Sequence, residues 1–142
     1  MKNITTQFLN KTNACSDAVA WGKEQNLIGK PARPVLNALI KADKLEWANW
    51  LIVRVLPYKG YVSYAVYDAE LVIDIYEKKY PNDKRPREAI EVAKTCIKNP
   101  TAKNKNAANA AAYSADAAYS TADATRKEMK LKILKYGLTL LT

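Results

Sequence analysis

The stretch TAKNKNAANAAAYSADAAYSTADATRKEMKLKILKY, residues 101–136, decides the predicted fold of this chain. Apolar residues recur along it at steps of three and four, which places them on one face of an α-helix. Alanine dominates that face, and its high helix propensity and small side chain allow neighbouring helices to approach closely. We therefore expect one long helix against which the others pack. Its apolar face consists of Ala108, Ala111, Ala115, Ala118, Ala122, Met129, Ile133 and Tyr136.

The rest of the chain is also predicted to be helical. No long stretch alternates with period two, and four glycines leave little material for hairpin turns. The sequence predicts an all-α fold: a compact single-domain bundle of about six helices over residues 1–142, around the long alanine-rich C-terminal helix. We expect one helix that ends at Gly22 and another over residues 35–41 that is begun by Pro34. A further helix is expected to be opened by Asp43 and Glu46 and to end at Pro57. Two more are expected over residues 60–80 and over residues 87–98, the latter begun by Pro86.

Catalytic and metal chemistry find little support in the composition. The chain has no histidine, so it lacks the commonest general acid or base near pH 7 and the usual zinc ligand sets. No Gly-rich phosphate loop or nucleophile elbow occurs in the sequence. The carboxylates of Glu70, Asp74 and Glu77 share one helix face and are interpreted as a solvated acidic stripe, with a patch for a basic partner as the alternative. We expect a protein that is not an enzyme and binds no cofactor or metal.

The two cysteines and the N-terminal residues favour a cytoplasmic location. Cys15 and Cys96 have no CxxC spacing, so we expect two reduced thiols, with Cys96 packed in the core on one face of its helix. The N-terminal residues MKNI show no apolar signal region, and no apolar run approaches the roughly 20 residues of a membrane span. The sequence predicts a soluble, cytoplasmic protein without a membrane partner.

Positive charge is concentrated in residues 78–105 and 126–135, within a formal net charge of +9. If the two segments share a surface, they form the electrostatic footprint of a protein that binds a phosphate backbone. A solvated surface that only keeps the protein soluble is the alternative. A nucleic-acid-binding accessory protein is therefore one candidate function. Its candidate residues are Lys94, Lys98, Lys103, Lys105, Arg126, Lys127 and Lys130.

Two aromatic clusters offer other sites. Trp47, Trp50 and Arg54 lie close together on their helix, which predicts a cation–π contact that holds a helix pair, with an exposed binding hot spot as the alternative. Asp68 falls on the apolar side of its helix near Tyr61 and Tyr64. A buried carboxylate needs hydrogen bonds or a counter-ion, so a structural polar network is expected there. The alternative is a small-ligand pocket lined by tyrosines.

Four segments carry a family resemblance. The first is IYEKKYPNDKRPREAIEVA, residues 75–93. The others are NAC at residues 13–15 leading to Trp21, WANWL at residues 47–51, and the Ala- and Tyr-rich residues 107–124. Together they span nearly the whole chain, and they resemble the immunity-five-like family of immunity proteins. Members of that family are predicted from gene neighbourhoods to neutralise toxins of bacterial polymorphic-toxin systems, and relatives occur in phage genomes.

The resemblance implies an all-helical, non-enzymatic protein that neutralises a toxin or a host-defence factor by binding it. It brings no catalytic residues. In the first motif, Asp83, Arg85 and Arg87 are expected to bond across a turn and hold two helices at a set angle. Because the chain is basic, a partner with an acidic surface fits its charge. The candidate partner-binding residues are Trp47, Trp50, Arg54, Lys84, Arg85 and Arg87.

Overall fold

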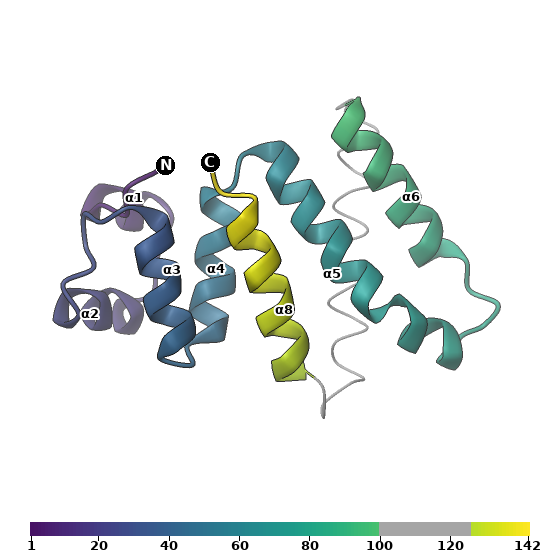
Figure 1. Ribbon diagram of the computed structural model, residues 1–142, viewed down its shortest axis with the longest axis horizontal. Helices are drawn as coiled ribbons and strands as arrows, with labels where there is room; N and C mark the ends of the chain where they lie inside the picture. Colours follow the sequence, from purple (N-terminus) through teal and green to yellow (C-terminus); the bar gives the residue numbers. More distant parts are fainter. Residues whose placement is uncertain (100–125) are drawn as a thin grey trace. The chain divides into compact units, whose positions relative to one another are not determined.

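The computed structural model describes residues 1–99 and 126–142 (Figure 1). Within these ranges the chain forms seven α-helices and no strand beyond one isolated bridge between Asn3 and Pro31, so the predicted all-α class is confirmed. None of the described helices is long and apolar enough to cross a membrane. The helices are α1 (Thr6–Lys11), α2 (Ser16–Glu24), α3 (Ala32–Lys41), α4 (Leu45–Val55), α5 (Tyr58–Lys79), α6 (Arg85–Lys98) and α8 (Arg126–Thr139).

Contacts divide the chain into two compact units. The first comprises residues 1–55 together with residues 141–142, and the second comprises residues 56–140. The expected single domain over residues 1–142 stays a prediction. So does the long alanine-rich helix, because residues 101–125 lie outside the described part of the chain.

In the first unit, α3 packs against α4, and the N-terminal segment is held to the turn that precedes α3. The backbone N–H of Ile4 donates to the carbonyl of Lys30 at 2.8 Å, and the N–H of Gly29 donates to the carbonyl of Ile4 at 2.7 Å. These bonds satisfy backbone groups that would otherwise be buried without partners. The core of this unit contains Ile4, Leu9, Leu27, Val35, Leu36, Leu39, Leu45, Leu51 and Ile52.

The helices α1, α2 and α3 end in the same way. Each is followed by a residue with a left-handed backbone: Asn13 (φ 54°), Asn26 (φ 53°) and Asp43 (φ 59°). Asparagine and aspartate tolerate this conformation better than other residues with a Cβ. The next N–H then bonds back to the last turn, which is the Schellman arrangement. The closing bonds are Ala14 N–H to Leu9 C=O (3.0 Å), Leu27 N–H to Gly22 C=O (2.9 Å) and Lys44 N–H to Leu39 C=O (2.9 Å).

Three expected boundaries were wrong by a few residues. Gly22 does not end its helix; it lies inside α2, where a Cβ would come within 3.2 Å of Ile28 Cδ1, so close packing explains the glycine. Pro34 is the third residue of α3 instead of its first. The N–H groups of the first helical turn have no acceptor within the helix, so a proline there removes no intrahelical hydrogen bond. Pro86 is likewise the second residue of α6, after Arg85.

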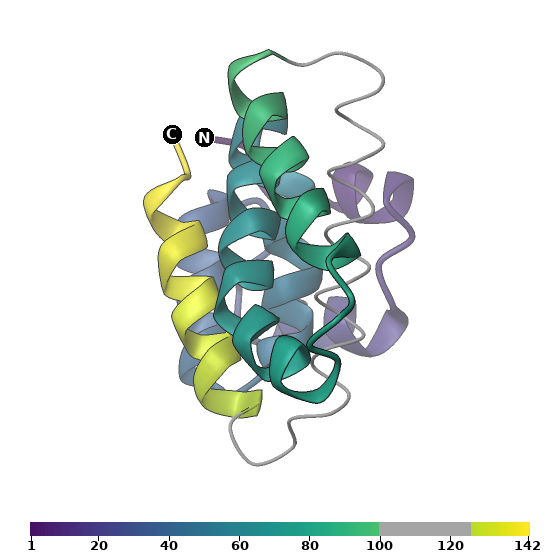
Figure 2. The ribbon, with the colours of Figure 1, turned by 90° about the vertical axis from the view of Figure 1, so that its right-hand side faces the viewer.

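The second unit is built around α5, with α6 and α8 alongside it (Figures 1 and 2). Cys96 of α6 is fully buried, as predicted, and it shares a 3.0 Å hydrogen bond with the Tyr58 hydroxyl. On α8, Ile133 is buried, and the ring of Tyr136 stacks on that of Tyr67 at 4.2 Å between centroids. Both α8 residues belong to the predicted apolar face, so the described end of that face does pack against protein.

Candidate functional site

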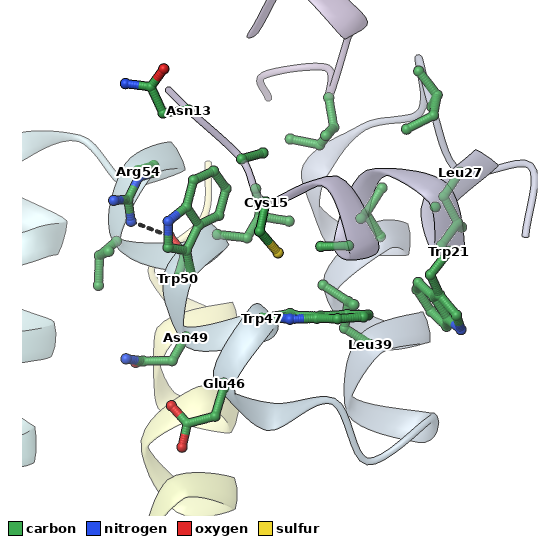
Figure 3. A pocket seen from close by; sticks show the side chains of 18 residues that line it. Asn13, Cys15, Trp21, Leu27, Leu39, Glu46, Trp47, Asn49, Trp50 and Arg54 are labelled. Atoms are coloured by element: carbon green, nitrogen blue, oxygen red, sulfur yellow. Dashed lines mark hydrogen bonds between the residues drawn. The ribbon is translucent and has the colours of Figure 1, made fainter. Parts of the chain in front are cut away.

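The first unit contains a pocket of about 520 Å³ (Figure 3). Its lining comes from residues 13–15, from α2, α3 and α4, and from the turn after α2. Trp21, Trp47 and Trp50 are the only tryptophans in the sequence, and all three line this pocket. The structure therefore brings the predicted pair Trp47 and Trp50 to one concave surface. Buried apolar lining residues are Ile4, Leu27, Val35, Leu39 and Leu51.

Lys44 does not line the pocket, but it contacts two of the tryptophans that do. The rings of Trp21 on α2 and Trp47 on α4 lie 6.1 Å apart between centroids, tilted by 57°. The Lys44 ammonium lies 4.4 Å from the Trp47 ring centroid and 5.7 Å from that of Trp21. A cation within about 6 Å of a ring centroid is attracted by the ring quadrupole. Lys44 was not among the predicted site residues, although its position three residues before Trp47 was a usable signal.

The predicted cation–π contact is present on α4. The Arg54 guanidinium lies 4.0 Å from the Trp50 ring centroid, and its Nη1 donates to the Trp50 carbonyl at 2.8 Å. Both residues lie on α4, one turn apart, so this contact stiffens α4 and does not itself join two helices. The helix-to-helix contact is made by Trp47 with Trp21 instead.

The pocket has polar groups at its edge and a thiol in its lining. Glu46 and Arg54 are its charged lining residues in the described part of the chain, and they lie eight residues apart on α4, which is about 12 Å along a helix. Figure 3 shows Glu46 and Arg54 at opposite ends of the tryptophan pair. The Cys15 thiol is free and exposed. The arrangement suits recognition of an apolar group and offers no nucleophile with a neighbouring base.

The other predicted partner-binding residues lie at the turn between α5 and α6, in the second unit. Asp83 accepts hydrogen bonds from Arg85 Nε (2.9 Å), Arg85 Nη2 (2.8 Å) and the Tyr76 hydroxyl (2.8 Å). Bonding to Arg85, and then to Tyr76, holds the pKa of the Asp83 carboxyl well below its usual range. The expected bonding across this turn is therefore present: Tyr76 of α5 bonds to Asp83, which Arg85 also holds, and Arg87 pairs with Glu77 of α5. Lys84 is exposed beside them.

The acidic stripe on α5 proves to be the partner of α6. Arg87 pairs with Glu77 and, at 3.7 Å, with Asp74. Lys94 pairs with Glu70 at 2.5 Å. Hydrogen bonding to Arg87 lowers the pKa of Glu77. The stripe is solvated in part, with the Asp74 side chain 84% exposed, but its ion pairs with the helix packed antiparallel to α5 were not predicted.

The candidate nucleic-acid residues are only partly described. Lys103 and Lys105 lie outside the described residues, as does the side chain of Arg126. Lys94 is engaged by Glu70 and by Glu91, which partly neutralises its charge. Burial lowers the pKa of Lys130, which is half-buried. Lys98 and Lys127 are exposed.

The third candidate group lies on α5. Tyr64 is buried, Tyr61 is half-buried, and the Oδ1 atom of Asp68 is buried. Burial raises the pKa of Tyr64, and the negative charge of Asp68 one turn away raises it further. The polar network expected around Asp68 stays a prediction. These side chains do not line the pocket formed by residues 4–54 or the one formed by residues 79–85.

Among the described residues, no three or more Cys, Asp or Glu side chains are grouped so that they could hold a metal ion. No protein-family model, curated protein or solved structure matches this chain. The family resemblance thus rests on the sequence motifs, and the function has to be inferred from the site.

Proposed function

We propose that this chain is a non-enzymatic protein-binding module, similar to immunity proteins, that neutralises a toxin or a host-defence factor by direct binding. A phage-encoded anti-defence role belongs to the same proposal. The observation that supports it most is the pocket of the first unit, into which the chain's three tryptophans are gathered. Tryptophan and arginine are the residue types that most often dominate the binding energy of protein interfaces.

The pocket has the properties of a preorganised anchor site. Trp47 and Trp50 are half-buried, so a partner side chain could cover their remaining surface. Removing apolar surface from water is worth about 25 cal/mol per Å², and an aromatic ring supplies a large area with few rotatable bonds. Both tryptophans project from α4, whose Ala48 and Ile52 are fully buried. A rigid helix holds an anchor site in place better than a loop does.

The proposal extends to the partner's surface and to the setting. The net charge of +9 favours a partner with an acidic face. A cytoplasmic location is part of the proposal, as is a compact bundle in which residues 101–136 form one long helix. The Lys84, Arg85 and Arg87 group would add a second, charged contact surface.

The test is capture of the products of the genes next to this one. The full-length chain is co-expressed with each neighbouring product, purified through a tag and analysed by size-exclusion chromatography. We expect one product to co-elute as a stable complex and to be less toxic to cells when the chain is present. Trp50→Ala should release it, whereas Lys30→Ala, at an exposed site away from the pocket, should not. A complex that survives Trp50→Ala would contradict the proposal.

A second candidate function is that of a nucleic-acid-binding accessory protein, and the turn between α5 and α6 supports it. Tyr80 is 46% exposed there, and Lys78, Lys79 and Lys84 are exposed around it. An exposed aromatic ring among cations can stack on an unpaired base. However, the Lys79 ammonium already lies 5.6 Å from the Tyr80 ring centroid.

Binding to labelled single- and double-stranded DNA and RNA, measured across a salt series, separates the two candidates. If the protein-binding proposal holds, binding is absent at physiological salt, or appears only at low ionic strength. Binding that persists at physiological salt, with a steep linear dependence of log K on log salt, would favour the nucleic-acid function. Tyr80→Ala and Lys84→Ala would then be the first variants to measure.

A further inference from the structure

We propose that the pocket of the first unit recognises an acidic, apolar peptide segment of the partner. An apolar side chain of that segment enters among the tryptophans, and a carboxylate next to it pairs with Arg54. This inference rests on the proposed protein-binding function and specifies the chemistry of the bound segment.

The size and lining of the pocket define the apolar part of the ligand. At about 520 Å³, it falls within the range of roughly 300–1,000 Å³ typical of ligand pockets, which is enough for one or two large side chains. The walls combine buried aliphatic side chains, such as Leu39 and Leu51, with the rings of Trp47 and Trp50. Such a surface gains free energy by excluding water from an aliphatic or aromatic group.

The placement of the cations defines the charged part. Arg54 lines the pocket and lies over the ring of Trp50, whereas Glu46 is the charged lining residue at the other end. Lys44 does not line the pocket, but its ammonium lies near the rings of Trp47 and Trp21. A guanidinium has five N–H donors, and the bond from Arg54 to the Trp50 carbonyl uses one of them. The others can receive a carboxylate from the partner, and a charge-assisted bond of this kind is stronger than a neutral one.

The alternatives to an acidic segment are disfavoured by Arg54 and by the charge of the first unit. A purely apolar segment that covered the pocket would remove water from Arg54 without giving it a counter-ion, which is costly. A basic segment would be repelled by Arg54 and could pair only with Glu46 among the charged lining residues. Across the first unit, eight Lys and Arg residues stand against four Asp and Glu residues, so the longer-range field also attracts an acidic segment.

The inference is tested by selecting binders from a display library of random twelve-residue peptides on the immobilised full-length chain. We expect the enriched peptides to combine an aromatic or aliphatic residue with Asp or Glu within a few positions. For a synthetic peptide of the consensus, Arg54→Gln should weaken the dissociation constant about tenfold, because it removes a charge-assisted contact. Arg54→Lys, which keeps the charge, should lose about threefold or less. Lys30→Gln is the matched control and should bind like the unchanged protein.

Every other result counts against the inference. A selection that enriches no peptide, or enriches basic or uncharged ones, overturns it. Equal binding by the unchanged protein and by both Arg54→Gln and Trp50→Ala overturns it too, because the bound peptide would then lie elsewhere. The inference is also overturned if sedimentation shows that the chain self-associates and a second copy occupies the pocket. Since the protein-binding proposal is tested with the neighbouring gene products, it can survive the failure of this inference or fail independently.

Discussion

Three residues with left-handed backbones fix the ends of the first three helices. Asn13, Asn26 and Asp43 each occupy the position after a helix's C-cap, where glycine is the commonest choice in proteins. The chain uses residues with short polar side chains instead, which tolerate this conformation at a modest cost. The second and third of these ends lead directly into the segments that carry Leu27 and Trp47, so they help to set the walls of the pocket.

Substitutions at Asn26 should show this constraint. Asn26→Ala places a residue with an unfavourable left-handed backbone at φ 53°, and we expect the free energy of unfolding to fall by about 1 kcal/mol. Asn26→Gly should leave it unchanged or raise it slightly, because glycine adopts positive φ without strain. Urea denaturation measures both. The control is Gln25→Ala at the preceding, exposed residue, where φ is −84° and little change is expected. Equal losses for Asn26→Ala and Asn26→Gly would contradict this account.

The stability of the second unit should depend on the charge of Asp83. The pKa of this carboxyl is lowered in the folded chain by Arg85 and Tyr76. The ionised carboxylate therefore stabilises the fold fully above its unfolded pKa of about 3.9, and this stabilisation declines as the pH falls below that value. Asp83→Asn should therefore destabilise the protein at pH 7, and its difference from the unchanged protein should shrink at acid pH. Denaturant titrations between pH 7 and pH 2 measure that difference. A pH-independent difference would show that the charge of Asp83 does not stabilise the fold.

Arg85→Gln provides the companion measurement, because it removes the other half of the same ion pair. It should destabilise the protein at pH 7 and lose that effect over the same pH interval. Tyr76→Phe should retain the pH dependence, since the Arg85 bonds to Asp83 remain. If Tyr76→Phe abolishes the dependence and Arg85→Gln does not, the tyrosine hydroxyl is the dominant cause of the lowered pKa.

At the scale of helices, α5 and α6 form an antiparallel pair whose register can be read from its ion pairs. Glu77 meets Arg87 and Glu70 meets Lys94, so seven residues on one helix match seven on the other in the opposite direction. The two paired residues of each helix are about two turns apart, so both ion pairs lie on the sides of α5 and α6 that face each other. This was the signal in the sequence that would have assigned the acidic stripe to α6.

The helix α8 should be held mainly by its buried apolar residues. Leu134 is 1% exposed, so Leu134→Ala should lower the free energy of unfolding by about 2–5 kcal/mol through lost burial and the cavity it leaves. Lys135→Ala, at the adjacent exposed position, should change it by less than about 0.5 kcal/mol. Thermal or urea denaturation of the full-length chain distinguishes them. Similar small effects for both variants would mean that α8 is not packed on the core.

The helices themselves were predictable because apolar spacing of 3.6 residues is a local property. The all-α class followed from it, as did the burial of Cys96 and Ile133. Helix ends were less predictable, because they depend on single residues whose role is set by packing. Gly22 looked like a helix stop, but its lack of a side chain serves the close approach of Ile28 instead.

At the scale of the whole molecule, the sequence predicted part of the candidate site. Trp47, Trp50 and Arg54 were proposed together from their spacing on one helix, and they do share the pocket. Trp21 joins them only through the packing of α2 beside α4, which no local pattern reveals. The net charge of +9 was readable from composition, but the ion pairs that engage Lys94 and Arg87 were not.

We propose that the pocket of the first unit is the surface that binds the partner protein. Because Trp21, Trp47 and Trp50 are the chain's only tryptophans and all line that pocket, quenching of their fluorescence by acrylamide reports on it directly. The decisive measurement is this quenching with and without the captured partner, prepared as a variant lacking tryptophan. We predict that the bound partner lowers the quenching constant at least about twofold, since it covers the half-exposed rings of Trp47 and Trp50. A saturated complex with unchanged quenching would contradict the claim, because the partner would then bind away from the tryptophans.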